Sequence, residues 1–179
     1  MKRWTIPLAL TLLALAASSL AQMSGPGADA VRKFADALHK AEGVSANLTI
    51  QVVGGARRVV GVQLAKPNLA RIDTPDRLIV ADGQKVTFLD KRKKVYFTRA
   101  QTDAELHKAL EEQGAEIFRP FFDAKAVDAM FRAVRTEPDA NRRGVRYRVV
   151  NATLAGAPGR TMRLFLRTDD GIARVAELT

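Results

Sequence analysis

Apolar and polar residues alternate over most of residues 64–97. Alternation with a period of two is typical of strands with one buried face, because successive side chains point to opposite sides. Turn signals divide this stretch at Pro67, at Pro75 and at Asp82-Gly83, where glycine favours a tight hairpin. The pattern predicts about four short antiparallel strands with a shared apolar face. The residues assigned to that face are Leu64, Leu78, Val80, Val86, Phe88, Val95 and Phe97.

Two longer alternating runs precede this stretch. They cover residues 44–53 and 57–66, and Gly54-Gly55 lies between them as a turn. We expect both to be strands that continue the same sheet. Their apolar faces carry Leu48, Ile50 and Val52 in the first run, and Val60, Val62 and Leu64 in the second.

Helical spacing appears in three places. A stripe between Asp29 and Gly43 predicts a first helix, and the capping box Thr102-x-x-Glu105 begins a second. Asp123 is a good N-cap for a third, which Pro138 and Asn141 end. The apolar stripe of this third helix is Val127, Met130, Phe131 and Val134.

Strand patterns return from Arg143 to Leu178, with a hairpin at Asp169-Asp170-Gly171. The order is a helix, about six strands, two or three helices and about three strands, which predicts an α+β fold. Nine strands with one apolar face are expected to curl. We therefore expect a strongly curved antiparallel sheet, an unclosed β-barrel whose concave face is covered or filled by helices.

One set of short motifs carries a family resemblance. Lys-Pro-Asn-Leu at 66–69 is followed by Pro75, by Leu-Ile-Val-x-Asp-Gly at 78–83 and by Phe-x-Asp at 88–90. In this order, over residues 28–98, the chain resembles the periplasmic outer-membrane lipoprotein carriers of the LolA type. The resemblance implies the same unclosed barrel over helices, with an apolar cavity between them.

The resemblance also implies a role for one side chain. The carriers usually have arginine before the proline of this stretch, where it tethers a lid by hydrogen bonds. Lys66 occupies that position here and keeps the charge, but it lacks the forked geometry of arginine. The helical region from Thr102 to Val134 is also longer than in the carriers, which indicates a divergent relative.

The N-terminus has the pattern of a secretory signal. Lys2 and Arg3 precede an apolar run over residues 6–17, and small residues at Ser19 and Ala21 fit a signal-peptidase site. We expect cleavage after Ala21, a single domain over residues 22–179, and a periplasmic protein. An uncleaved membrane anchor is the alternative.

Composition narrows the chemistry. The chain has no cysteine, and its net charge is +10. Because the basic residues are dispersed and no run of five occurs, we do not expect a nucleic-acid partner. An anionic membrane or a solvated basic surface would explain the charge. No nucleophile, carboxylate dyad, phosphate loop or metal-ligand spacing is present, so we expect neither an enzyme nor a metal or other cofactor.

Residues 117–122 place aromatic side chains around Pro120, which disfavours a regular core helix. This segment can be a movable lid over the cavity, or its phenylalanines can simply plug the barrel. The residues assigned to the lid are Phe118, Phe121, Phe122, Met130 and Phe131, with Lys66 as tether.

The leading functional hypothesis is a monomeric periplasmic carrier. It would bind lipoprotein acyl chains in an apolar cavity and bring them to the outer membrane. The resemblance implies two partners, an inner-membrane lipoprotein-release transporter and an outer-membrane receptor. The alternatives are a general lipid-binding or envelope-stress sensor domain, and a structural domain without ligand that binds protein.

Overall fold

The computed structural model describes residues 24–51, 57–156, 159–169, 171 and 173–178. The predicted leader, Val52 and the Gly54-Gly55 turn lie outside the described residues.

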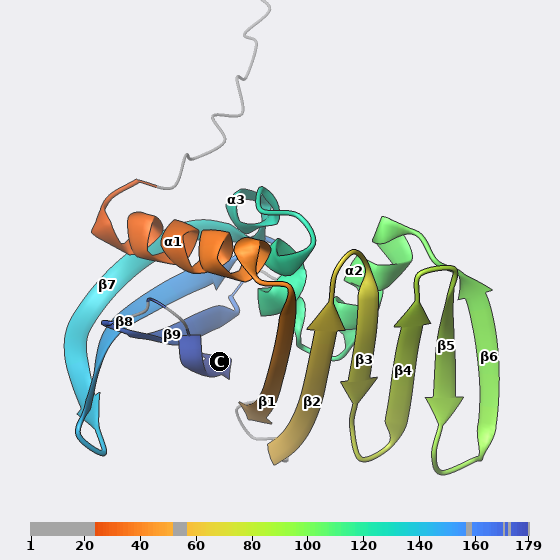
Figure 1. The fold of residues 1–179 in the computed structure, drawn as a ribbon. Helices are drawn as coiled ribbons and strands as arrows, with labels where there is room; N and C mark the ends of the chain where they lie inside the picture. The colour runs from red at the N-terminus through yellow and green to blue at the C-terminus, as the bar shows by residue number, and fades with distance from the viewer. Residues whose placement is uncertain (1–23, 52–56, 157–158, 170, 172, 179) are drawn as a thin grey trace, which may run out of the picture.

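The chain forms an α+β fold with two antiparallel sheets, neither of which closes on itself (Figure 1). The antiparallel α+β class predicted from the sequence is confirmed, but the single curved sheet is not. Six strands make the first sheet in sequence order, and four make the second in the order β10-β9-β8-β7. The first sheet contains β1 (Gly43–Gln51), β2 (Arg57–Ala65), β3 (Leu69–Asp73), β4 (Arg77–Asp82), β5 (Lys85–Asp90) and β6 (Val95–Ala100). The second contains β7 (Phe131–Arg142), β8 (Val145–Leu154), β9 (Thr161–Arg167) and β10 (Ala173–Leu178).

Tight turns fix the register of the first sheet. The Asp82 carboxylate accepts hydrogen bonds from the amides of Gln84 and Lys85, and Gly83 has a φ of 94° that other residues rarely adopt. The predicted hairpin at Asp82-Gly83 is thus confirmed. Short turns leave no freedom to slip, so residues directly opposite one another share a face across the whole sheet.

The register corrects the face assigned to β4. Ile79 pairs with Ile72 on one side and Phe88 on the other, and it is only 2% exposed. Leu78 and Val80, predicted for the inner face, lie on the outer face and are half-buried. The segment has four apolar residues in succession, so hydrophobicity does not select a face and the hairpins decide it.

A second correction concerns the third predicted helix. The helix α3 (Ala126–Met130) ends where β7 begins, and Pro138 and Asn141 lie inside that strand. Irregular pairing after Phe131 and after Glu137 indicates β-bulges. The bulges place every third residue on the more buried side, and this spacing imitates a helical stripe. Arg143-Gly144, both with positive φ, form the hairpin to β8.

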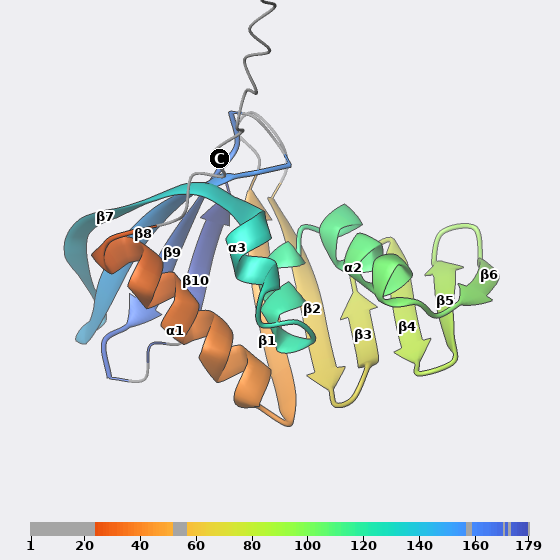
Figure 2. The ribbon, with the colours of Figure 1, turned by 90° about the horizontal axis from the view of Figure 1, so that it is seen from above.

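The remaining helices lie on the inner side of the two sheets (Figure 2). The first, α1 (Pro26–Lys40), packs on β7 and β8, and α2 (Asp103–Glu112) lies over the first sheet. Thr102 caps α2 as predicted, because its hydroxyl accepts a hydrogen bond of 3.2 Å from the Glu105 amide. The 3₁₀ helix η1 (Glu116–Phe121) connects α2 to α3 and packs against α1.

One hydrophobic core joins residues from both sheets and from all four helices. The sheets meet where β1 and β10 lie side by side without forming a ladder among the described residues. Among these residues, no helix is both long enough and apolar enough to cross a bilayer.

Candidate functional site

A cavity of about 380 Å³ lies where α1, β1, η1 and β10 meet. Its apolar wall comes from all four elements, so residues far apart in the sequence build it together. Its larger apolar residues include Phe34, Leu38, Val44, Leu48, Ile117 and Phe118.

The cavity exists because the two sheets separate between β1 and β10, and because small side chains line the space between these strands. Ala46 on β1 and Ala173 and Ala176 on β10 face the cavity, where larger residues would fill it. A hydrogen-bonded ladder would hold the two strands about 4.8 Å apart. Since β1 and β10 belong to different sheets, they can diverge and leave room between them.

The polar residues that line this cavity are uncharged. Ser45, Asn47 and Thr49 lie along β1 at the cavity, and none of the described residues that line it is charged. Such a surface offers hydrogen bonds near an opening and apolar contact elsewhere, which suits a ligand with a polar end and a long apolar part.

Lys66 connects the end of β2 to η1. Its ammonium donates a hydrogen bond of 2.5 Å to the backbone carbonyl of Phe121 and lies 4.6 Å from the centroid of that ring. A hydrogen bond therefore joins Lys66 to residues 117–122, and the role of Lys66 as a lid tether stays a prediction. Because the acceptor is a backbone oxygen, the contact fixes the position of η1 irrespective of the side chain there.

The residues assigned to the lid separate into two groups. Phe118 lines the cavity, so η1 forms part of its wall. Phe121 is fully buried and meets the half-buried Phe122 edge to face, with 4.9 Å between centroids. Met130 and Phe131 are buried in the core as well. In this conformation the second group fills the interior, as the plug interpretation expects.

The residues assigned to the cavity wall are also divided. Five of them belong to the packed core under the helices, namely Ile50, Val60, Val62, Leu64 and Val86. Leu48 alone among the predicted set lines the cavity described above. Val80 lies on the outer face, Val95 is exposed, and Val52 is outside the described residues. The cavity thus lies at the β1 edge of the sheet, at one end of the region predicted beneath residues 48–97.

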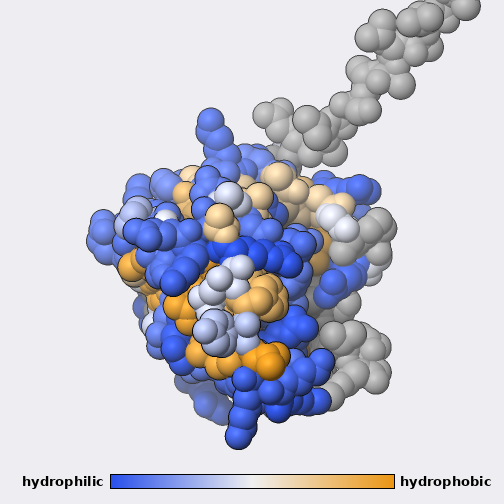
Figure 3. Space-filling view, turned by 90° about the vertical axis from the view of Figure 1, so that its right-hand side faces the viewer, coloured by the Kyte–Doolittle hydropathy of each residue, from blue (hydrophilic) through white to orange (hydrophobic). Residues whose placement is uncertain are grey.

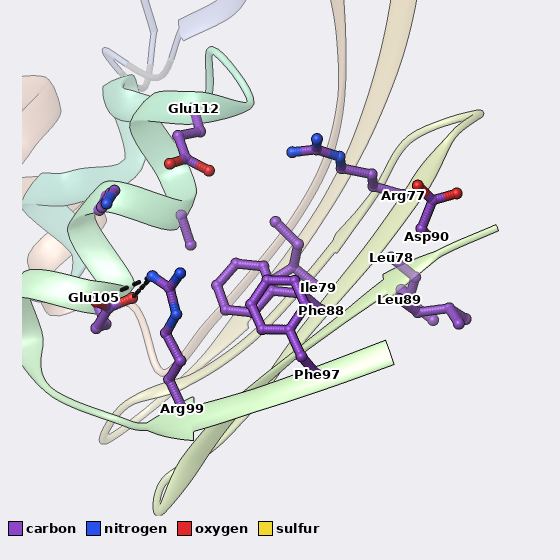
Figure 4. A pocket seen from close by; sticks show the side chains of 12 residues that line it. Arg77, Leu78, Ile79, Phe88, Leu89, Asp90, Phe97, Arg99, Glu105 and Glu112 are labelled. Carbon is purple, nitrogen blue, oxygen red and sulfur yellow. Dashed lines mark hydrogen bonds and ion pairs between the residues drawn. The ribbon is translucent and has the colours of Figure 1, made fainter. Parts of the chain in front are cut away.

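The remaining three, Leu78, Phe88 and Phe97, border a smaller hollow of about 140 Å³ between α2 and β4–β6 (Figure 4). The rings of Phe88 and Phe97 face it, whereas the side chain of Leu78 lies on the outer face of the sheet. Phe88 and Phe97 stack with centroids 4.8 Å apart. The guanidinium of Arg99 lies near both rings and pairs with Glu105 at 3.2 Å. This groove is below the usual size of a ligand pocket and has a charged rim.

A buried carboxyl group lies directly before residues 117–122. Glu116 in η1 is only 8% exposed, and burial raises the pKa of its carboxyl. Its Oε2 atom has no hydrogen-bond partner among the described residues. On α2, burial and the neighbouring Arg119 lower the pKa of His107. Among the described residues, no three histidine, aspartate or glutamate side chains lie close enough to hold a metal ion.

Sequence reasoning identified the α1 stripe that supplies Phe34 and Leu38 but did not place it at the site. It missed the contribution of β10, because no local pattern shows that the last strand lies beside the first. No protein-family model and no curated protein matches this chain. The resemblance to lipoprotein carriers therefore rests on the short motifs alone.

Proposed function

We propose that this protein binds an acyl chain in the cavity between α1, β1, η1 and β10, and acts as a periplasmic carrier of lipoprotein acyl chains. The observation that carries the proposal is an uncharged, mainly apolar cavity next to an aromatic segment held by a single lysine. The LolA-type fold is part of this proposal, and the open pair of antiparallel sheets over helices is consistent with it.

The energetics favour this type of ligand. Burying an acyl chain gains roughly 0.8 kcal/mol per methylene, so about 16 carbons offer on the order of 12 kcal/mol before ordering costs. No specific charged contact is needed for retention. The polar end of the ligand would lie toward the edge of β1 that carries Ser45, Asn47 and Thr49.

The volume sets a limit on the cargo. Ligand pockets span about 300 to 1,000 Å³, and 380 Å³ lies near the lower end of that range. The described conformation accommodates a single chain, so a lipoprotein with several chains requires enlargement. Movement of η1 away from α1 and β1 would enlarge the cavity, and the Lys66 contact to Phe121 opposes that movement.

The same volume favours a second candidate function. A general lipid-binding or sensor domain would take one free single-chain lipid without opening further. The two functions share the site and differ in cargo. The inner-membrane transporter and the outer-membrane receptor are partners of the first function only.

Native mass spectrometry of protein purified from the periplasm tests the proposal. A co-purifying acylated lipoprotein supports the carrier, and a free lipid supports the sensor. A protein without ligand that also fails to bind a fluorescent fatty acid would overturn both.

A matched pair of variants tests the location. Ala46→Phe fills the cavity and should lower the affinity for the fluorescent fatty acid by at least about tenfold, since one ring displaces several methylenes. Ala104→Phe introduces the same change at an exposed position of α2 and should leave the affinity unchanged. Equal affinities in both variants would place binding elsewhere.

A further inference from the structure

The outermost strand of the first sheet is exposed along its whole length. Among the described residues, β6 pairs with β5 only, which leaves its other edge open. Val95 is 56% exposed, Tyr96 71% and Phe97 51%. Figure 3 views the molecule from this end and shows hydrophobic atoms gathered between hydrophilic ones.

The backbone of β6 presents hydrogen-bonding groups at this edge. Beyond the ladder, the Gln101 amide donates to the Gln84 carbonyl at 2.9 Å, so odd-numbered residues of this strand face β5. Because antiparallel bonding alternates, the N–H and C=O groups of Tyr96, Thr98 and Ala100 point away from the sheet.

This edge has little of the usual protection. Proteins block exposed edges with proline, charged side chains, bulges or a covering element. Residues 95–100 contain neither proline nor lysine, Arg99 is their one charged residue, and their pairing with β5 is regular. A lipid surface would leave the outward backbone groups unsatisfied, whereas an added strand satisfies them. The edge is thus suited to pairing with another strand.

We propose that β6 pairs with β6 of a second copy of this chain, antiparallel about a two-fold axis at Thr98, so that the two six-stranded sheets become one. This register joins the outward-pointing groups of Tyr96, Thr98 and Ala100 to those of the second copy. It replaces the monomer expected from the sequence, and it does not depend on lipid binding.

Side-chain chemistry favours this register. It places Phe97 opposite Arg99 of the second copy, and within one chain these two groups already lie 5.3 Å apart as a cation–π pair. Beyond the strand ends, it brings the turn that carries Lys93 to the same end of the contact as Asp103, the first residue of α2, in the second copy. Both residues are exposed, and neither has an ion-pair partner among the described residues. Opposite charges thus meet twice across the axis.

The neighbouring registers are less favourable. A shift by two residues in one direction opposes Arg99 to Arg99, which is repulsive. The shift in the other direction moves Lys93 away from Asp103 and opposite the neutral Gln101. Only the register centred on Thr98 gains both interactions.

Sedimentation velocity over a wide concentration range tests the proposal, with protein from cells that process the leader. The unaltered protein should show a monomer–dimer equilibrium. Thr98→Pro should be monomeric, because proline removes an N–H at the centre of the contact without affecting the bonds to β5. The control Thr98→Val keeps that N–H and should still dimerise. Equal melting temperatures of the two variants would show that folding is intact.

A charge exchange tests the register. Lys93→Asp should weaken the dimer by at least about tenfold, because two repulsive contacts replace two attractive ones. Adding Asp103→Lys should restore the affinity. A failure to restore it would overturn this register. A monomer at all concentrations, or a Thr98→Pro variant that dimerises normally, would overturn the dimer. Monomers whose exposed strand instead binds vesicles of anionic phospholipid would assign the edge to a membrane.

Discussion

The two ends of the six-stranded sheet have similar alternating sequences and opposite surroundings. Near the β1 end, Val60 and Val62 of β2 are fully buried beneath the helices. At the β6 end, Val95 and Phe97 lie on the same inner face and are more than half exposed. Alternation thus indicates which side chains share a face, but the helices determine whether that face is covered.

This difference divides the sheet by role. The covered end supplies the core and supports η1, the wall of the proposed lipid cavity. The exposed end contributes little to the core and leaves an edge available to a second chain. Paired substitutions at the two ends should therefore differ in their effect on the free energy of unfolding.

The largest difference is expected between two phenylalanines. Phe121→Ala should lower the free energy of unfolding by about 3–5 kcal/mol, because it leaves a cavity in the core. Phe97→Ala should cost about 1 kcal/mol, mainly through its stacking on Phe88. Urea denaturation of both variants measures the two values. Equal losses would mean that the ends do not differ in the way the burial indicates.

Two lysines give a smaller difference. Lys66→Met keeps most of the side-chain volume but removes the donor to the Phe121 carbonyl, so the loss should be about 1.5–3 kcal/mol. Lys85→Met, at the exposed start of β5, should change stability by less than about 0.5 kcal/mol.

A further variant, Lys66→Arg, keeps the positive charge at position 66 but changes the geometry of the hydrogen-bond donor. If Lys66→Arg retains the stability that Lys66→Met loses, the charged hydrogen bond fixes η1. If both variants match the unaltered protein, the contact does not hold the segment in place, and the proposed resistance to opening has no basis.

Local signals in the sequence predicted much of the first sheet. The hairpin at Asp82-Gly83 and the cap at Thr102 depend on short-range hydrogen bonds, and both are present. The predictions for the inner face of β4 and for the segment that forms β7 were wrong for a shared reason. An unbroken apolar run and two bulges each remove the period from which a face or an element type is inferred.

The candidate site was less predictable than the fold. The contact of Lys66 with residues 117–122 followed from the resemblance and is present. The cavity itself depends on the meeting of β1 with β10, a contact between the first and the last described strands. Neither strand contains a signal for the other, so only the three-dimensional arrangement reveals the space between them.

The smallest effect is expected at Glu116, the buried acid of the covered end. Its ordinary pKa is 4.5, and burial raises that value in the fold, although Arg160 and Arg119 lower it in part. The folded protein then binds the proton more tightly than the unfolded chain. Stability is favoured at low pH and decreases as the pH rises from about 4.5 through the raised pKa.

The Glu116→Gln variant removes this titration while keeping the shape of the neutral acid. It should be more stable than the unaltered protein by on the order of 1 kcal/mol near neutral pH, since a buried charged oxygen without a partner is unfavourable. The advantage should disappear near pH 4, where the acid is protonated. Glu112→Gln, at the charged rim of the groove, should change stability by less than about 0.5 kcal/mol. Thermal melts of the unaltered protein and the two variants at neutral pH and at pH 4 measure the effect. A gain in stability of Glu116→Gln that is equal at both pH values would show that the Glu116 carboxyl does not titrate in a dry interior.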